Sequence, residues 1–382
     1  MTQKLAIIGA SAFQNPLILK AKDMGIETHV FAWECGDLGE KTADYFYPIS
    51  ITEIGEITEK CREIGIDGIC SIGTDLGNIA VSAVASALGL CANSVDCVKQ
   101  STNKYLMRRS FFDHGDPSPW SVRVQSMNDL EVESLTYPII VKPVDRSGSR
   151  AITRLEGPDG LECAVAAATE ASFDGAAVVE EFFEGNEYSV EFVSWKGEHH
   201  FLALTEKFTT GAPHFIETGH LQPPEIDSET LARIQKVVAH ALDGLGVEFG
   251  ASHSEILINS SGEIRIVEIG SRMGGDCIGS DLVELSTGVD FLRAVISISL
   301  GIAPDLKPLH DPAGAMIRFV FGKEDIEALN LAADSHDVRV EKEYLSDDFS
   351  HEIIDSGSRY GFFILSAETN DLLMPYLPRK SF

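Results

Sequence analysis

The chain has 382 residues, of which 44% are hydrophobic and 23% charged, so intrinsic disorder is excluded and two or three packed domains are expected. A formal net charge of −29 disfavours nucleic acid and anionic membrane surfaces as partners, and any bound phosphate therefore needs cations gathered locally. The longest apolar run, Leu76–Cys91, is too short to cross a bilayer, and the N-terminus shows no secretory pattern. We therefore expect a cytoplasmic protein. The seven cysteines have neither a disulfide framework nor a zinc-ligand spacing.

The first hundred residues alternate short apolar strands with helical stretches, a rhythm that predicts a small α/β domain with a parallel sheet. The predicted strands are Lys4–Gly9, Glu27–Trp33 and Gly68–Gly73, and the predicted helices are Phe13–Met24, Glu53–Ile64 and Leu76–Leu88.

After a predicted helix at Asn103–His114, two prolines interrupt the chain and paired strands replace the alternation. We place a domain boundary near residue 100 and expect residues 101–302 to form an α+β domain that carries the chemistry. Residues 303–382 contain two or three strand candidates, including Ala315–Phe321 and Gly361–Ser366, and few reactive side chains. They are expected to form a small C-terminal α+β subdomain.

The segment Pro138-Ile-Ile-Val-Lys142-Pro143 predicts a buried strand that ends in a lysine, and the small residues Ser147, Gly148 and Ser149 follow closely. An ammonium beside exposed backbone N–H groups can neutralise phosphate oxygens. A surface hairpin is the alternative. Further on, Val178-Val-Glu180-Glu181-Phe182 predicts a strand with two consecutive acids, which point to opposite faces. One of them should be buried and hydrogen-bonded, unless this is an edge strand with both acids in water.

The most informative segment runs from His253 to Arg272. Two apolar strands flank Ser261-Gly262, a pair suited to a two-residue hairpin turn, and that register places Glu255 directly opposite Glu268. Facing carboxylates repel each other, so a cation is expected between them, and oxygen ligands favour Mg²⁺. The alternative is a solvated pair relieved by a nearby arginine.

Two further side chains are candidates for contact with substrate. Arg272 follows Glu268 by four residues and could hold a carboxylate or phosphoryl group in its guanidinium fork. His220 lies in the turn-rich stretch Glu217-Thr-Gly-His220-Leu-Gln-Pro223, although a lone histidine is more often structural than catalytic.

In order and spacing, these segments resemble the ATP-grasp superfamily over about residues 1–300, and most closely its carboxylate–amine ligases of the L-amino acid (dipeptide) ligase type. The resemblance implies an α/β pre-ATP-grasp domain at residues 1–100 and an ATP-grasp fold at 101–302, with residues 120–182 as a mobile lid. It also implies ATP and Mg²⁺, or Mn²⁺, as ligands, and a homodimer is an expectation at the level of the family.

The roles implied by the resemblance fall on twelve residues. Lys104 and Lys142 resemble the phosphate lysines, and Ser147, Gly148 and Ser149 the mobile loop. Glu180 and the Phe182 backbone would hold adenine, Glu187 the ribose, Glu255 and Glu268 the metal, Arg272 the acyl phosphate and His220 the substrate. The chain departs from the family at Gly270, where many members have asparagine, so the geometry of a second metal ion is open.

The resemblance therefore implies an ADP-forming ligase that activates a small carboxylate as an acyl phosphate and joins it to an amine, with amino acids as the expected substrates. Two alternatives stay open. One is an enzyme like those of carbamoyl phosphate synthesis or purine biosynthesis, and the other is a nucleotide-binding protein without catalysis.

Overall fold

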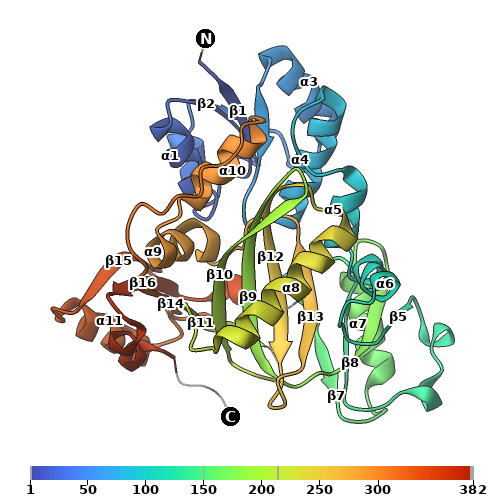
Figure 1. The fold of residues 1–382 in the computed structure, drawn as a ribbon. Helices are drawn as coiled ribbons and strands as arrows, with labels where there is room; N and C mark the ends of the chain where they lie inside the picture. Colours follow the sequence, from blue (N-terminus) through green and yellow to red (C-terminus); the bar gives the residue numbers. More distant parts are fainter. Residues whose placement is uncertain (1, 149, 213–214, 379–382) are drawn as a thin grey trace.

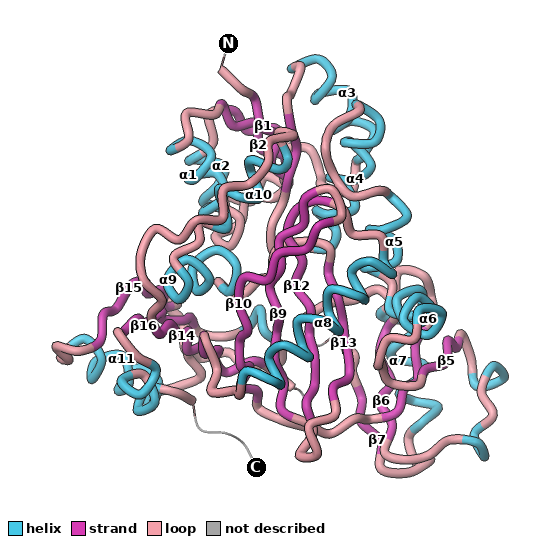
Figure 2. The backbone as a smooth tube through the Cα atoms, viewed as in Figure 1, coloured by secondary structure: helices cyan, strands magenta, loops and turns pink. Residues whose placement is uncertain are grey.

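The computed structural model describes residues 2–148, 150–212 and 215–378, whose strands form three sheets (Figures 1 and 2). The N-terminal sheet is parallel in the order β3-β2-β1-β4, as the alternating pattern predicts. Its strands are β1 (Lys4–Ile8), β2 (Glu27–Phe31), β3 (Tyr45–Tyr47) and β4 (Gly68–Cys70), and the accompanying helices are α1 (Asn15–Asp23), α2 (Leu38–Thr42), α3 (Ile54–Ile64), α4 (Asp75–Leu88) and α5 (Val95–Thr102). The sequence pattern missed the short edge strand β3 and the helices α2 and α5.

The second sheet is antiparallel in the order β5-β8-β6-β7. Its elements are β5 (Ser121–Val124), β6 (Ile139–Pro143), β7 (Thr153–Leu155), β8 (Ala177–Glu181) and the helix α7 (Leu161–Ala171). Alternation along the strands separates two faces. Val141 and Val179 pack in one apolar cluster with Leu161 of α7, so Lys142 and Glu180 point to the opposite face.

The third sheet has eight strands in the order β13-β12-β9-β10-β11-β14-β16-β15. They are β9 (Asn186–Trp195), β10 (Glu198–Thr209), β11 (Glu217–Gln222), β12 (Phe249–Ile258), β13 (Ile264–Gly270), β14 (Gly314–Phe319), β15 (Val338–Leu345) and β16 (Gly361–Ala367). The C-terminal strands β14, β16 and β15 thus extend the sheet of the preceding domain and do not form a sheet of their own.

Helices cover the large sheet unevenly. In Figure 1, α8 (Ser228–Leu245) crosses the strands β9, β12 and β13, where Val190, Phe192 and Ile256 pack in one core with α8 and α6 (Lys104–His114). Glu187 and Glu255 occupy alternate strand positions to these residues and therefore face the other side. The remaining α-helices are α9 (Val283–Thr287), α10 (Phe291–Ser299) and α11 (Lys323–Ala333), with a π-helical turn at Ile278–Leu282.

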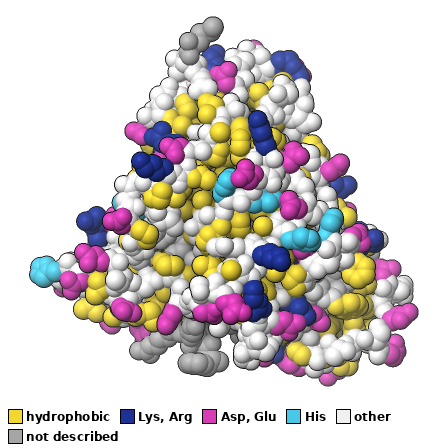
Figure 3. Space-filling model, in the orientation of Figure 1, with side chains coloured by type: hydrophobic (Ala, Val, Ile, Leu, Met, Phe, Trp, Pro, Cys, Tyr) yellow, Lys and Arg dark blue, Asp and Glu magenta, His cyan; other side chains and the backbone are white. Residues whose placement is uncertain are grey.

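A shared core joins the N-terminal sheet to the large sheet. Ile7 of β1 and Ala21 of α1 belong to the same buried cluster as Val193 of β9 and Phe291 of α10. On the face shown in Figure 3, acidic and basic side chains are interspersed. Among the described residues, no helix has both the length and the apolar character needed to cross a membrane.

Candidate active site

A cavity of about 660 Å³ opens between the four-stranded sheet β5-β8-β6-β7 and the face of the eight-stranded sheet that α8 leaves uncovered. Ten of the twelve residues singled out from the sequence line it: Lys104, Lys142, Ser147, Gly148, Phe182, Glu187, His220, Glu255, Glu268 and Arg272. Of the other two, Glu180 lies behind the cavity wall with 1% of its surface exposed, and Ser149 lies outside the described residues.

Glu180 is held by two buried cations. Lys142 Nζ lies 2.7 Å from Glu180 Oε2, and Arg108 Nε lies 2.9 Å from Glu180 Oε1. Burial disfavours the carboxylate, but the charges of Arg108 and Lys142 outweigh it and lower the pKa of Glu180. The predicted burial and bonding of this acid are confirmed, and the edge-strand alternative is wrong because β8 lies between β5 and β6.

Lys104, the first residue of α6, reaches the end of β13. Its Nζ lies 3.0 Å from Glu268 Oε2 and donates a hydrogen bond to the carbonyl of Arg146 at 2.8 Å. Burial opposes the ammonium charge, but Glu268 outweighs burial and raises the pKa of Lys104. One cation therefore connects a strand of the large sheet with the loop that carries Ser147 and Gly148.

Glu255 and Glu268 are direct partners in the β12–β13 ladder, as predicted. The predicted two-residue turn at Ser261-Gly262 is wrong. The N–H of Asn259 donates to the carbonyl of Glu263 at 3.1 Å, so three residues form the loop, and the last of them, Gly262, has a φ of +77°. This is the three-residue hairpin with glycine in the left-handed region.

A bulge restores the register that the longer loop shifts by one residue. Ile256 pairs with Ile266, whereas Glu255 pairs with Glu268, so Val267 is the extra residue of β13. The carbonyl of Val267 accepts a hydrogen bond from Arg108 Nη2 at 2.7 Å. The one-residue shift from the loop and the one-residue shift from the bulge cancel, so the two acids face each other.

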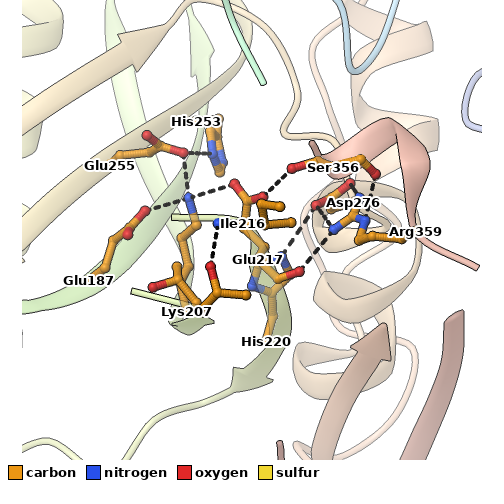
Figure 4. Close-up of polar contacts among 12 residues, drawn as sticks. Glu187, Lys207, Ile216, Glu217, His220, His253, Glu255, Asp276, Ser356 and Arg359 are labelled. Atoms are coloured by element: carbon orange, nitrogen blue, oxygen red, sulfur yellow. Dashed lines mark hydrogen bonds and ion pairs between the residues drawn. The ribbon is translucent and has the colours of Figure 1, made fainter. Parts of the chain in front are cut away.

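Lys207 of β10 lines the cavity, and three carboxylates surround its ammonium group (Figure 4). Its Nζ lies 2.6 Å from Glu187 Oε1, 2.6 Å from Glu255 Oε1 and 3.9 Å from Glu217 Oε1. Burial opposes the ammonium charge, but the three carboxylates raise the pKa of Lys207 well above its ordinary value. Glu255 therefore meets a lysine, as Glu268 does.

A second polar group lies beside Lys207 in Figure 4. Asp276 accepts two hydrogen bonds from Arg359, with distances of 2.8 and 3.0 Å, and His220 Nε2 lies 3.8 Å from Asp276 Oδ2. Burial disfavours the protonated imidazole and lowers the pKa of His220. Arg359 comes from the loop between β15 and β16, and Ser356 of the same loop donates a hydrogen bond to Glu217 at 2.5 Å.

Arg272 lies at the end of β13, where its Nε donates to Asp75 Oδ1 at 2.8 Å. Asp75 is the first residue of α4, so this ion pair joins the N-terminal domain to the cavity. A Cβ at Gly270 would lie 3.1 Å from Cζ of Arg272. The glycine found where the family often has asparagine is thus the residue that leaves room for this guanidinium.

The remaining predicted residues line the side of the cavity formed by the sheet β5-β8-β6-β7. Gly148 adopts a φ of +73°, which glycine tolerates without strain. The Phe182 N–H already donates to the carbonyl of Pro138 at 3.0 Å, and the guanidinium of Arg154 lies 4.1 Å from the centre of the Phe182 ring. Because the Phe182 N–H is already bonded, a ligand would have to use the Phe182 carbonyl.

The ATP-grasp domain family matches residues 135–280, the stretch that includes every strand from β6 to β13. This region is an ATP-grasp domain. Solved structures support the same fold over the whole chain: an L-amino acid ligase from Bacillus licheniformis has a TM-score of 0.83 at 21% identity, and a phosphoribosylglycinamide synthetase from Anaerococcus prevotii has 0.78 at 19%. Each alignment covers 98% of this chain and 96% of the other. The predicted fold class is confirmed.

Curated relatives of this chain are longer proteins. The alanine–anticapsin ligase of Bacillus subtilis is 24% identical over 297 residues, which are 69% of this chain and 62% of that protein. Human carnosine synthase 1 is 23% identical over 338 residues, 80% of this chain and 40% of that protein. The chain thus spans less than two thirds of the length of these relatives.

The sequence reasoning missed several residues at the site of the ATP-grasp domain. Lys207 carried a weak signal, a lysine near the end of a strand whose middle, Phe201-Leu-Ala-Leu204, is apolar. Arg108 follows Lys104 by four residues, which places both on one face of α6. Asp276 and Arg359 carried no local signal, because their pairing joins positions 83 residues apart.

Within the described ranges, no group of three or more His, Cys, Asp or Glu side chains is arranged to hold a metal ion. The donor chemistry nevertheless fits Mg²⁺, which typically takes one or two protein carboxylates and leaves its other positions to water and phosphate. Glu255 and Glu268 are such a pair, and each faces an ammonium group in this structure.

His253 gives this site a pH-dependent contribution to stability. Its Nδ1 lies 2.6 Å from Oε1 of the fully buried Glu191, and its Nε2 lies 3.5 Å from Glu255 Oε1. Burial opposes protonation, but Glu191 and Glu255 outweigh it and raise the pKa of His253 to about 9. The protonated ring stabilises the fold fully below the unfolded pKa of about 6.5, and this contribution is lost as the pH rises through about 9.

Between pH 6 and 9.5, the wild type should therefore lose roughly 1–3 kcal/mol more of its free energy of unfolding than His253→Gln. Urea unfolding across this range measures the difference, and His336→Gln, at an exposed histidine, serves as the control. Parallel pH profiles for the wild type and His253→Gln would contradict the prediction.

Proposed function

We propose that this chain is an ADP-forming carboxylate–amine ligase that uses MgATP and amino acids. The observation that carries the proposal is the opposed pair Glu255–Glu268, which shares one cavity of an ATP-grasp domain with Lys104, Lys142 and Arg272. The relatives named alanine–anticapsin ligase and L-amino acid ligase support amino acids as substrates.

In this proposal, ATP and the amino acids bind to different residues of the cavity. Lys104 and Lys142 would neutralise the phosphates, Glu187 would bind the ribose, and the Phe182 backbone would bind adenine, while the buried Glu180 would hold Lys142 in position. Glu255 and Glu268 would hold Mg²⁺ or Mn²⁺, which when bound supplies positive charge at the phosphate oxygens. The end formed by Glu217, His220 and Asp276 is left for the amino acids.

The reaction would proceed in two transfers. An oxygen of the substrate carboxylate attacks the terminal phosphorus, the bond from phosphorus to the ADP oxygen breaks, and an acyl phosphate forms. The amine nitrogen then attacks the acyl carbon, phosphate leaves, and the nitrogen loses a proton. The Arg272 fork would hold the phosphoryl oxygens in both transfers, and the loop that carries Ser147 and Gly148 would shield the acyl phosphate from water.

The test is phosphate release from MgATP across a panel of amino acids, offered singly and in pairs, with mass spectrometry of the products. The proposal expects release that depends on particular amino acids, accompanied by a product whose mass is the sum of two substrates less one water. Stimulation by bicarbonate or a ribosyl amine alone would favour the carbamoyl phosphate or purine type of enzyme instead. ADP binding with no turnover on any substrate would favour a nucleotide-binding protein.

A homodimer and a cytoplasmic location stay proposals alongside the activity. Sedimentation of the purified chain at several concentrations tests the first of them.

A further inference from the structure

Lys207 has more negative charge around it than one ammonium can neutralise. Glu187 and Glu255 each lie 2.6 Å from its Nζ, and Glu217 lies 3.9 Å away, so three carboxylates from three strands surround one ammonium group (Figure 4). The imidazole of His253 also contacts Glu255, with its Nε2 3.5 Å from the same oxygen that Lys207 binds. Buried carboxylates repel one another strongly, so this cluster favours the entry of further positive charge.

The strand geometry limits how Lys207 can respond. Its strand β10 is bonded to β9 on one side and to β11 on the other, so the backbone is fixed on both edges. The lysine side chain is flexible, and its ammonium can move between acceptors by rotation alone. Glu217 and Glu187 are both within reach when Glu255 is given up.

We propose that Lys207 is an internal counter-cation of the metal site. It holds Glu255 Oε1 while the cavity is empty and yields that oxygen when a divalent ion enters with a nucleotide. The proposal rests on the proposed function, because Glu255 is a metal ligand only there. Lys104 is less suited to this exchange because its ammonium is also anchored on the Arg146 carbonyl.

The exchange has a direct consequence for metal affinity. A bare divalent ion must displace an ammonium that lies 2.6 Å from its ligand oxygen, and such competition weakens metal binding as a bound proton does. A metal–nucleotide complex brings its own phosphate oxygens to the ion and new anionic partners for the displaced ammonium. Metal and nucleotide should therefore enter together.

The experiment measures Mn²⁺ binding to the nucleotide-free full chain by electron paramagnetic resonance of the free ion. Lys207→Met should bind Mn²⁺ roughly ten-fold more tightly than the wild type, because Glu255 loses the ammonium 2.6 Å from its oxygen and keeps only the more distant imidazole of His253, at 3.5 Å. Lys207→Arg keeps the charge and should bind like the wild type. In the double variant Lys207→Met/Glu255→Gln, the gain should disappear.

Equal Mn²⁺ affinities of the wild type and Lys207→Met would overturn the proposal. A gain that survives in the double variant would overturn it as well, because the ion would then lie away from Glu255. Loss of the lysine could instead unfold the chain, so thermal unfolding is recorded for each protein, and Lys207→Gln replaces Lys207→Met if needed. The Mn²⁺ measurement needs no turnover, so a Lys207-dependent gain in a chain that is inactive on the substrate panel would reject the ligase and retain the exchange.

Discussion

Glu268→Gln is expected to lower kcat for ligation by roughly 10³-fold while the fold and ADP binding persist. Glutamine keeps the size of the side chain but removes the charge that would hold the divalent ion opposite Glu255. It also removes the ionic partner of Lys104, although the Arg146 carbonyl continues to bond that ammonium. The measurement is steady-state phosphate release with the best amino acid pair of the panel.

Glu263→Gln is the matched control for this substitution, because Glu263 lies on the same hairpin with its side chain 44% exposed and pairs with Arg265. Its activity should stay within about two-fold of the wild type, since an exposed ion pair contributes little. A Glu268→Gln protein that keeps more than about a tenth of wild-type activity would contradict the metal assignment.

The pairing of Glu255 with Glu268 could be predicted from the sequence, but the predicted length of the loop between the two strands was wrong. Alternation in two apolar strands and a turn-forming glycine were sufficient to show that the segment is a hairpin. They could not distinguish a two-residue turn from a three-residue loop, since glycine suits both. The bulge at Val267 has no sequence signature of its own, and its one-residue shift happens to restore the predicted pair.

Lysines and acids next to turns and strand ends were predictable because their roles follow from nearby residues. Asp276 and Arg359 were not, because their contact depends on strand order in the large sheet. The strand β11 pairs with β14, which lies about 90 residues further along the chain, and β14 pairs in turn with β16. Local periodicity contains no information on such pairings, so residues 303–382 were expected to form a small subdomain with few reactive side chains.

Arg272→Lys is expected to lower kcat by roughly 10²-fold with little change in the KM for ATP. Lysine keeps the positive charge at the end of β13, but its ammonium cannot reproduce the planar fork that would hold two phosphoryl oxygens at once. The selective effect on kcat follows if the guanidinium acts on the transferring group and not on the bound nucleotide. Steady-state kinetics with ATP and each amino acid varied in turn measure this separation.

A further variant tests whether the orientation of the Arg272 guanidinium matters, and another serves as the control. Asp75→Asn removes the carboxylate that accepts from Arg272 Nε at 2.8 Å, and it should lower kcat less than Arg272→Lys, because the fork remains and only its anchor is weakened. Arg293→Lys, at an arginine with 44% of its side chain exposed, should leave both constants unchanged. If Arg272→Lys raised the KM for ATP and left kcat intact, Arg272 would be a nucleotide ligand, and another residue would have to hold the phosphoryl group during transfer.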